Sequence, residues 1–222
     1  MGAVGSAVAS ILGGLAGNGG SASSADQAWD HVWYPGERDT DTGSASTLYD
    51  GTASGGCSTI SNGSSGTALR IPAGNSFTLG AAANIDVGRA DYTVETRCKF
   101  PSGIKSSGGG IFGRSTSGAW ASNDRSSMFV LTSGHISVQE YGISGVTGGQ
   151  DLADDTWRVL RVMVHNSPLL GRRVLFFVNG LFIKEGAWAP SADSAHADLH
   201  IGPITSGWSG PIDVDYLKYR KL

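Results

Sequence analysis

The sequence predicts an all-β protein, a two-sheet antiparallel sandwich with an extended N-terminal arm. Runs of alternating or β-branched residues follow one another along the chain, separated by turn residues. No stretch keeps a helical period over about 12 residues, and the lysines and glutamates that long amphipathic helices use heavily are scarce. The 222 residues include 34 glycines without a collagen period, which indicates many turns.

The first 25 residues are an arm rich in glycine, alanine and serine, with no charged side chain. Small residues bury too little area for such a segment to order itself through a core of its own. Ile11, Leu12 and Leu15 are its bulky apolar side chains that lie close together, and we expect them to enter a pocket of another chain. Residues 1–25 are therefore interpreted as an assembly arm.

The arm does not resemble a signal peptide or a membrane span. A signal peptide would begin with basic side chains, and the glycines of residues 13–20 interrupt the apolar run that a span requires. The segment Met1–Ser6 matches the formal N-myristoylation pattern, which small residues match easily. A lipidated surface protein is therefore kept as a third alternative.

Residues 26–65 are expected to lead into the body of the protein. The aromatic stretch Trp29–Tyr34, closed by Pro35 and Gly36, predicts a first strand or an anchor into the body. Residues 36–66 are rich in glycine, serine, threonine and aspartate, and are expected to be loop-like.

Residues 66–222 are expected to form the body. Asp91–Phe100 alternates cleanly, with Tyr92, Val94, Thr96, Cys98 and Phe100 on one face. Asn179-Gly180 is the strongest hairpin signal, because this dipeptide favours a type I′ turn. The other predicted strands are Ala68–Ile71, Ser76–Leu79, Gly110–Gly113, Ser127–Leu131, His135–Tyr141, Trp157–His165, Arg173–Val178, Asp198–Ile201 and Ile212–Tyr219.

The order of these strands resembles the laminin-G-like and concanavalin A-like jelly rolls. The similar segments are Asp91–Phe100, Gly110–Arg114, Met128–Tyr141, Asp155–Val162, Leu175–Leu181, Leu199–Gly202 and Gly210–Tyr216. The resemblance covers residues 66–222 and implies a jelly-roll sandwich; residues 1–45 have no counterpart in that family.

A jelly roll of this kind would bury the apolar residues of its central strands. Trp157, Phe176, Val178, Ile212 and Val214 are the expected core residues. The two cysteines allow one disulfide at most, and Cys98, in an apolar strand pattern, is expected to be a buried free thiol.

The resemblance also raises calcium as a cofactor, with Asp50 and Asp213 as the candidate ligands. The alternative is that both aspartates cap turns or hold the sheet end. No other cofactor is expected.

Catalytic patterns are missing from the sequence. Glycanases of this fold class carry closely spaced carboxylates, yet only four glutamates occur here, in no such pattern. A pair from distant strands stays open, since Glu95 and Glu140 could share a face. No nucleophile elbow precedes a helix, and His196 and His200 would lie about 13 Å apart in an extended segment. The protein is predicted not to be an enzyme.

Glycan binding is better supported by the sequence. Sugar sites combine aromatic rings with Asn, Asp or Gln side chains, and two loops have that composition. Trp120, Asn123 and Asp124 lie in one loop, and Trp208 lies in the other. Tryptophans in such loops also cover cores or subunit contacts, which is the alternative.

Together these features suggest a non-enzymatic bacteriophage virion protein. It would be a decoration or fibre subunit with a lectin-like body, joined to other virion subunits through its arm, and we expect a homo-oligomer. The alternative is a secreted, extracellular carbohydrate-binding module or glycanase. Nucleic acid is not expected as a partner, because the net charge is −3 and no basic run exceeds two residues.

Overall fold

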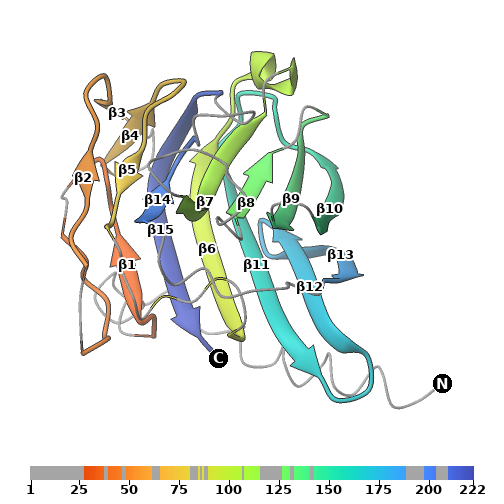
Figure 1. Ribbon diagram of the computed structural model, residues 1–222. Coiled ribbons are helices and arrows are strands. Elements are labelled where there is room, and N and C mark those ends of the chain that lie inside the picture. Colours follow the sequence, from red (N-terminus) through yellow and green to blue (C-terminus); the bar gives the residue numbers. More distant parts are fainter. Residues whose placement is uncertain are drawn as a thin grey trace.

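The computed structural model describes residues 28–222 apart from 38–39, 47–48, 62–65, 81–84, 86, 88–89, 107, 116–126, 131–132, 141–142, 189–197 and 204–209. Over this part of the chain the structure contains fifteen β-strands and one short 3₁₀ helix, η1 (Ser102–Ser106). All strand pairs are antiparallel, and they form two sheets (Figure 1). The all-β sandwich class predicted from the sequence is confirmed.

The first sheet contains the longest strands, and they run side by side across Figure 1. Their spatial order is β13 (Leu181–Ala187), β12 (Gly171–Val178), β11 (Arg158–Ser167), β6 (Tyr92–Lys99), β15 (Ile212–Lys221), β4 (Thr67–Ile71) and β3 (Ser58–Ser61). The strand β1 (His31–Trp33) pairs separately with the C-terminal half of β15.

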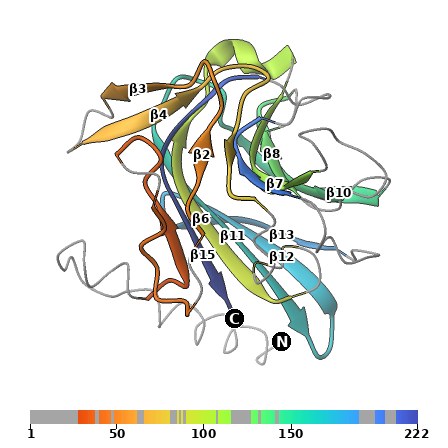
Figure 2. The same cartoon turned by 60° about the vertical axis from the view of Figure 1, so that its left-hand side comes forward.

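The second sheet packs on one face of the first, and Figure 2 shows the two layers from another side. Its spatial order is β10 (Ile143–Asp151), β9 (His135–Glu140), β8 (Ser127–Val130), β7 (Gly109–Ser115), β14 (Asp198–Ile201), β5 (Phe77–Thr78) and β2 (Thr52–Ala53).

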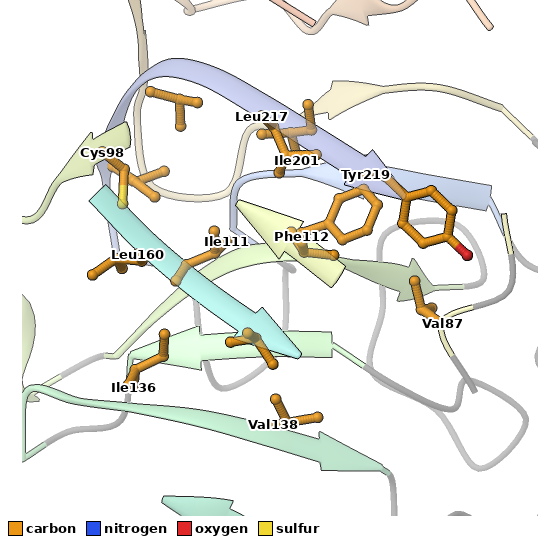
Figure 3. Close-up of a cluster of buried hydrophobic side chains, with 14 of the residues drawn as sticks. Val87, Cys98, Ile111, Phe112, Ile136, Val138, Leu160, Ile201, Leu217 and Tyr219 are labelled. Carbon is orange, nitrogen blue, oxygen red and sulfur yellow. The ribbon is translucent and has the colours of Figure 1, made fainter. Parts of the chain in front are cut away.

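The core lies between the sheets and follows the predicted alternation of β6. Tyr92, Val94 and Cys98 all point inward and are at most 4% exposed. Figure 3 shows Cys98 and Leu160 of the first sheet among Ile111 and Ile136 of the second. Cys98 is a buried free thiol, as predicted, and burial raises its pKa far above the usual range of a thiol.

The Asn179-Gly180 hairpin is also confirmed. Both residues have positive φ, 50° and 80°, as a type I′ turn requires. The Asn179 side chain explains the choice of asparagine, because its Oδ1 accepts a hydrogen bond of 2.9 Å from the backbone N–H of Val159. The turn is thereby tied to the start of β11 as well as to its own hairpin.

One predicted core residue is placed wrongly. Phe176, Val178, Ile212 and Val214 are almost fully buried, whereas Trp157 is only half-buried and lies outside the core. The register explains the difference, because Arg158 is the residue opposite the inward-facing Cys98. Trp157 is therefore carried to the opposite side, where Arg97 and Lys99 lie over its ring.

The segment expected to be loop-like belongs in part to the two sheets. The strand β3 pairs with β4 in the first sheet, and β2 pairs with β5 in the second. These strands have four and two residues, which is too short for an alternating pattern to be visible in the sequence. β1 also joins the body, and Trp33 is fully buried with its Nε1 donating to the Tyr49 carbonyl oxygen at 2.7 Å.

Ile11, Leu12 and Leu15 of the predicted arm lie outside the described residues, so their expected contacts stay a prediction. Within the described part of the chain, no helix is long and apolar enough to cross a membrane.

Candidate ligand-binding face

The first sheet has a second face, which points away from the second sheet and is called here the outer face. Alternation along β6 places Glu95, Arg97 and Lys99 on it, because their neighbours Val94 and Cys98 face the core. In six strands, from β4 to β13, the charged side chains on this face are Arg70, Glu95, Arg97, Lys99, Arg161, Arg173, Glu185, Asp213, Asp215, Lys218 and Arg220.

A β-bulge in β15 shapes the centre of the outer face. Val214 lies opposite Cys98 and Tyr216 lies opposite Arg97, so Asp215 is an extra residue in the ladder. Because of this extra residue, Tyr216 shares the outer face with Arg97, while Leu217 and Tyr219 turn into the core. The bulge therefore brings an aromatic ring and a carboxylate to the same place on the sheet.

Asp213 is held by two cations on this face. Arg70 donates from Nε to Oδ1 at 2.8 Å and from Nη2 to Oδ2 at 2.9 Å, and Lys99 Nζ lies 3.1 Å from Oδ2. Burial would raise the pKa of this carboxyl group, but the hydrogen bonds and charges of Arg70 and Lys99 outweigh it and lower the pKa. Asp213 is therefore ionised and fixed in position.

Glu95 and Asp215 extend this network across β6. Arg161 donates to Glu95 Oε2 from Nε at 2.8 Å, and the Tyr216 hydroxyl donates to Oε1 at 3.1 Å. Arg97 donates from Nη1 to Asp215 Oδ2 at 2.6 Å. Burial, together with the neighbouring Glu95, raises the pKa of Tyr216, which keeps its hydroxyl protonated as a donor.

Three half-buried aromatic residues cross the outer face, and they are called here the aromatic row: Trp157, Tyr216 and Tyr34. The guanidinium carbon of Arg97 lies 4.8 Å from the centroid of the Trp157 ring, and Lys99 Nζ lies 5.4 Å from it. Tyr34 meets Tyr216 edge to face at 6.2 Å. The row thus combines apolar ring surface with fixed donors and acceptors.

The glycan-binding residues predicted from the sequence, Trp120, Asn123, Asp124 and Trp208, lie outside the described residues. The structure does describe the strand ends that flank their loops. The first loop follows Ser115, at one end of β7. The second follows Pro203, and the backbone N–H of the preceding Gly202 donates a hydrogen bond to the carbonyl oxygen of Ile111, nearer the other end of β7. These flanking positions are about 13 Å apart along β7, so the two loops leave the sheet at different ends.

The structure places the two calcium candidates in different surroundings. Asp213 is paired with Arg70 and Lys99, which favours the structural alternative for this residue. Asp50 is exposed and accepts a hydrogen bond from the Asp41 backbone N–H at 3.1 Å. No cluster of three or more potential metal-ligating residues is found among the residues that the structure describes. Calcium binding at Asp50 stays a prediction.

Glu95 and Glu140 belong to different sheets, which does not support the expectation that they share a face. Glu95 lies on β6 of the first sheet and faces outward, whereas Glu140 ends β9 of the second sheet.

Sequence reasoning missed the aromatic row. Trp157 is a predicted core residue, Tyr34 belongs to the stretch predicted as a first strand or anchor, and no pattern points to Tyr216 as a surface residue. The available signal is the spacing of Asp213 and Asp215, which in strict alternation places two carboxylates on one face of a strand and Tyr216 on the other. The cations that meet these carboxylates come from strands more than 100 residues away along the chain, which a single sequence does not reveal.

Comparisons with known proteins identify the fold alone. No protein-family model matches the sequence, and no curated protein has significant sequence similarity to it. The structure is similar to the binding domain of Paraclostridial Mosquitocidal Protein 1, with a TM-score of 0.63, 10% identity, and coverage of 90% of this chain and 50% of the other. It is also similar to the receptor-binding domain of botulinum neurotoxin type G, with a TM-score of 0.57, 9% identity, and coverage of 86% and 47%.

A third similar structure has a length closer to that of this chain. It is domain 4 of AbnA, a GH43 extracellular arabinanase from Geobacillus stearothermophilus, in complex with arabinotriose, with a TM-score of 0.59 and 16% identity. The alignment covers 87% of this chain and 92% of that domain, whereas this chain spans about half the length of the two toxin domains. At these identities the likeness establishes a shared β-sandwich fold.

Proposed function

We propose that this protein is a non-enzymatic, lectin-like binding module that holds a glycan on its outer face. The observation that carries the proposal is the aromatic row, Trp157, Tyr216 and Tyr34, set among fixed charged side chains. Aromatic rings pack on the apolar C–H faces of sugar rings, and neighbouring polar groups bind the hydroxyls. The outer face supplies both kinds of contact along β11, β6 and β15 and at the end of β1.

The fixed positions of the polar groups favour binding. Arg97 is held by Asp215, and Tyr216 is held by Glu95. A ligand therefore meets side chains whose rotamers are already restricted, so less entropy is lost on binding. The similar arabinanase domain was solved with arabinotriose, and the similar toxin domains are binding domains, which supports the same class of function here.

The test is glycan binding by the full chain and by two matched variants. The variant Trp157→Ala removes the largest ring of the aromatic row. Phe182→Ala removes an aromatic ring from β13, at the edge of the same sheet, where Phe182 is 53% exposed. The glycans that bind are first identified on an array, and their affinities are then measured by calorimetry.

We expect Trp157→Ala to weaken binding by about thirtyfold, the size of a hot-spot effect, and Phe182→Ala to leave it unchanged. Equal affinities of the wild type and Trp157→Ala would overturn the proposed face. If no glycan binds the wild-type protein, the proposed function is wrong.

We further propose that this module is a subunit of a virus particle, a decoration or fibre protein joined to its neighbours by residues 1–25. The described chain starts beside the C-terminal end of β15, where Asp30 accepts a hydrogen bond from the Lys221 backbone N–H at 2.7 Å. The β11–β12 turn lies at the same end of the sheet (Figure 1) and exposes Leu169 by 93% and Leu170 by 60%. Large exposed apolar side chains at this end of the sheet suit a subunit contact.

Deleting residues 2–25 tests this second proposal. We expect the truncated body to stay folded and soluble but to leave its assembly, as measured by co-sedimentation with particles. The double variant Leu169→Ser, Leu170→Ser should weaken assembly in the full chain. Normal assembly by the truncated protein would contradict the virion proposal and favour the secreted module.

A further inference from the structure

The outer face carries an excess of positive charge in an acidic protein. Its six strands, from β4 to β13, present seven lysine and arginine side chains against four aspartates and glutamates, an excess of three. The whole chain has 16 basic and 19 acidic residues, so the remainder holds nine basic against fifteen acidic residues. Positive charge is thus concentrated on the face that carries the aromatic row.

The carboxylates of this face are already engaged by cations. Glu95 is paired with Arg161, Asp215 with Arg97, and Glu185 with Arg173. Asp213 is shared by two cations, Arg70 and Lys99. An anionic ligand that approaches the outer face would therefore meet cations whose own carboxylates are saturated, and the excess charge would attract it.

The cations lie beside the rings of the aromatic row. Arg97 and Lys99 are 4.8 and 5.4 Å from the ring centroid of Trp157. Lys218 Nζ is 4.8 Å from the ring centroid of Tyr216. Lys99 keeps part of its side chain accessible, at 21% exposure, and so does Arg97, at 20%. A matching ligand has an apolar ring face and an anionic group on the same ring.

We propose that the outer face recognises acidic glycans, whose sugar rings carry carboxylate or sulfate groups. This inference rests on the proposed glycan-binding function and adds the class of ligand. Rings of the aromatic row contact the sugar ring, and Lys99 and Arg97, whose side chains are partly exposed, bind the anionic substituents. Single-stranded nucleic acid, the other polyanion that combines rings with negative charge, is distinguished by the test.

The test compares ligands that differ in charge on the same backbone. Polygalacturonate is compared with its fully methyl-esterified form, and dextran sulfate is compared with dextran. A single-stranded DNA oligonucleotide of mixed sequence is the competing polyanion. Affinities are measured with the full chain at low and at physiological salt, because electrostatic binding weakens as salt increases.

Two lysine variants locate the effect. Lys99→Gln removes a cation beside Trp157 but leaves Asp213 its two hydrogen bonds from Arg70, so the fold is expected to persist. Lys184→Gln removes the same charge from β13, where Lys184 is exposed and lies opposite the core residue Phe176 in the register. Melting temperatures of both variants verify that each is folded.

We expect an acidic polymer to bind more tightly than its neutral counterpart, and Lys99→Gln to weaken that binding by about tenfold. Lys184→Gln should have no effect. Equal binding of charged and neutral polymers, equal effects of the two variants, or binding of DNA as tight as that of the acidic glycans would overturn the inference. If a neutral glycan binds, and its binding requires Trp157 but not Lys99, the proposed glycan-binding function is correct and the inference of acidic ligands is wrong. If no glycan binds, both the proposed function and the inference of acidic ligands are wrong.

Discussion

His31 Nδ1 and Asp41 Oδ2 lie 2.6 Å apart in the interior, with side chains that are 3% and 0% exposed. The same carboxylate accepts hydrogen bonds from three backbone N–H groups, those of Val32 at 2.9 Å, Gly43 at 3.0 Å and Tyr49 at 3.2 Å. Asp41 therefore links β1 to the segment that follows it, residues 41–49, through hydrogen bonds to both. A buried carboxylate with four donors is well satisfied, and it makes this part of the lead-in dependent on one side chain.

Asp41→Ala should destabilise the protein by about 3–5 kcal/mol, because it leaves buried donors without an acceptor. Chemical denaturation measures the change. Glu37→Ala is the control, since Glu37 is exposed in the same segment and should change stability by less than about 0.5 kcal/mol. A decrease of less than about 1 kcal/mol in the free energy of unfolding for Asp41→Ala would mean that the hydrogen bonds to Asp41 contribute little to stability.

The core residues and Trp157 should respond differently to truncation. Phe176→Ala and Ile212→Ala are expected to cost about 3–5 and 2–5 kcal/mol, because both side chains are fully buried between the sheets. Trp157→Ala should cost less, about 1–2 kcal/mol, because its ring is half-exposed on the outer face. If Trp157→Ala were as damaging as Phe176→Ala, the placement of Trp157 outside the core would be wrong.

The type I′ turn makes a finer prediction at Asn179. Asn179→Ala removes the hydrogen bond to the Val159 N–H and places alanine at a φ of 50°, so it should cost about 1–2 kcal/mol. Asn179→Asp keeps the acceptor and should cost less. Asn179→Gly keeps the freedom to adopt a positive φ but removes the side chain. The stability it loses therefore measures the hydrogen bond to Val159, and the further loss in Asn179→Ala measures the backbone strain. Equal stability of all four proteins would show that the turn is indifferent to this residue.

Acid should weaken the protein in a defined range of pH. The hydrogen bonds from Arg158 to Asp154 lower the pKa of that carboxyl group to about 2, from its ordinary 3.8. Stability from a lowered carboxyl pKa is present above the ordinary value and is lost as the pH falls from about 4 to about 2. Arg158→Gln should bring the pKa of Asp154 back towards 3.8, which a carboxyl NMR titration measures. An unchanged midpoint would mean that the ion pair is not maintained in solution.

The sequence reveals the parts of the fold that rest on local patterns, and it misses the parts that depend on register. The alternation of β6 and the Asn179-Gly180 turn are visible because side-chain period and turn chemistry are local. Tyr216 shows the limit. Strict alternation from Ile212 through Val214 would place Tyr216 in the core, but the extra residue Asp215 turns it outward. The candidate face depends on that bulge and on the position of Trp157.

The sequence does not predict β10, for a different reason. Its sequence, Ile-Ser-Gly-Val-Thr-Gly-Gly-Gln-Asp, contains three glycines, which are depleted in strands and read as a loop. Packing explains one of them, because a Cβ on Gly148 would approach the Ile136 side chain to 2.7 Å. The strand is therefore specified by its contact with β9 more than by β propensity, and a single sequence does not display such a contact.

The protein should have no hydrolytic activity on polysaccharides. The carboxylate of Glu95 is bound by Arg161 and by the Tyr216 hydroxyl, and β9, which ends at Glu140, belongs to the other sheet. Incubation with neutral and acidic polysaccharides should release no reducing sugar, even from a polymer that binds the outer face. Glu95→Gln should lower stability, because it weakens the pairing with Arg161, and should leave the absence of turnover unchanged. Release of sugar that is abolished by Glu95→Gln or Glu140→Gln would establish the glycanase alternative, and it would require a catalytic arrangement other than the one in this structure.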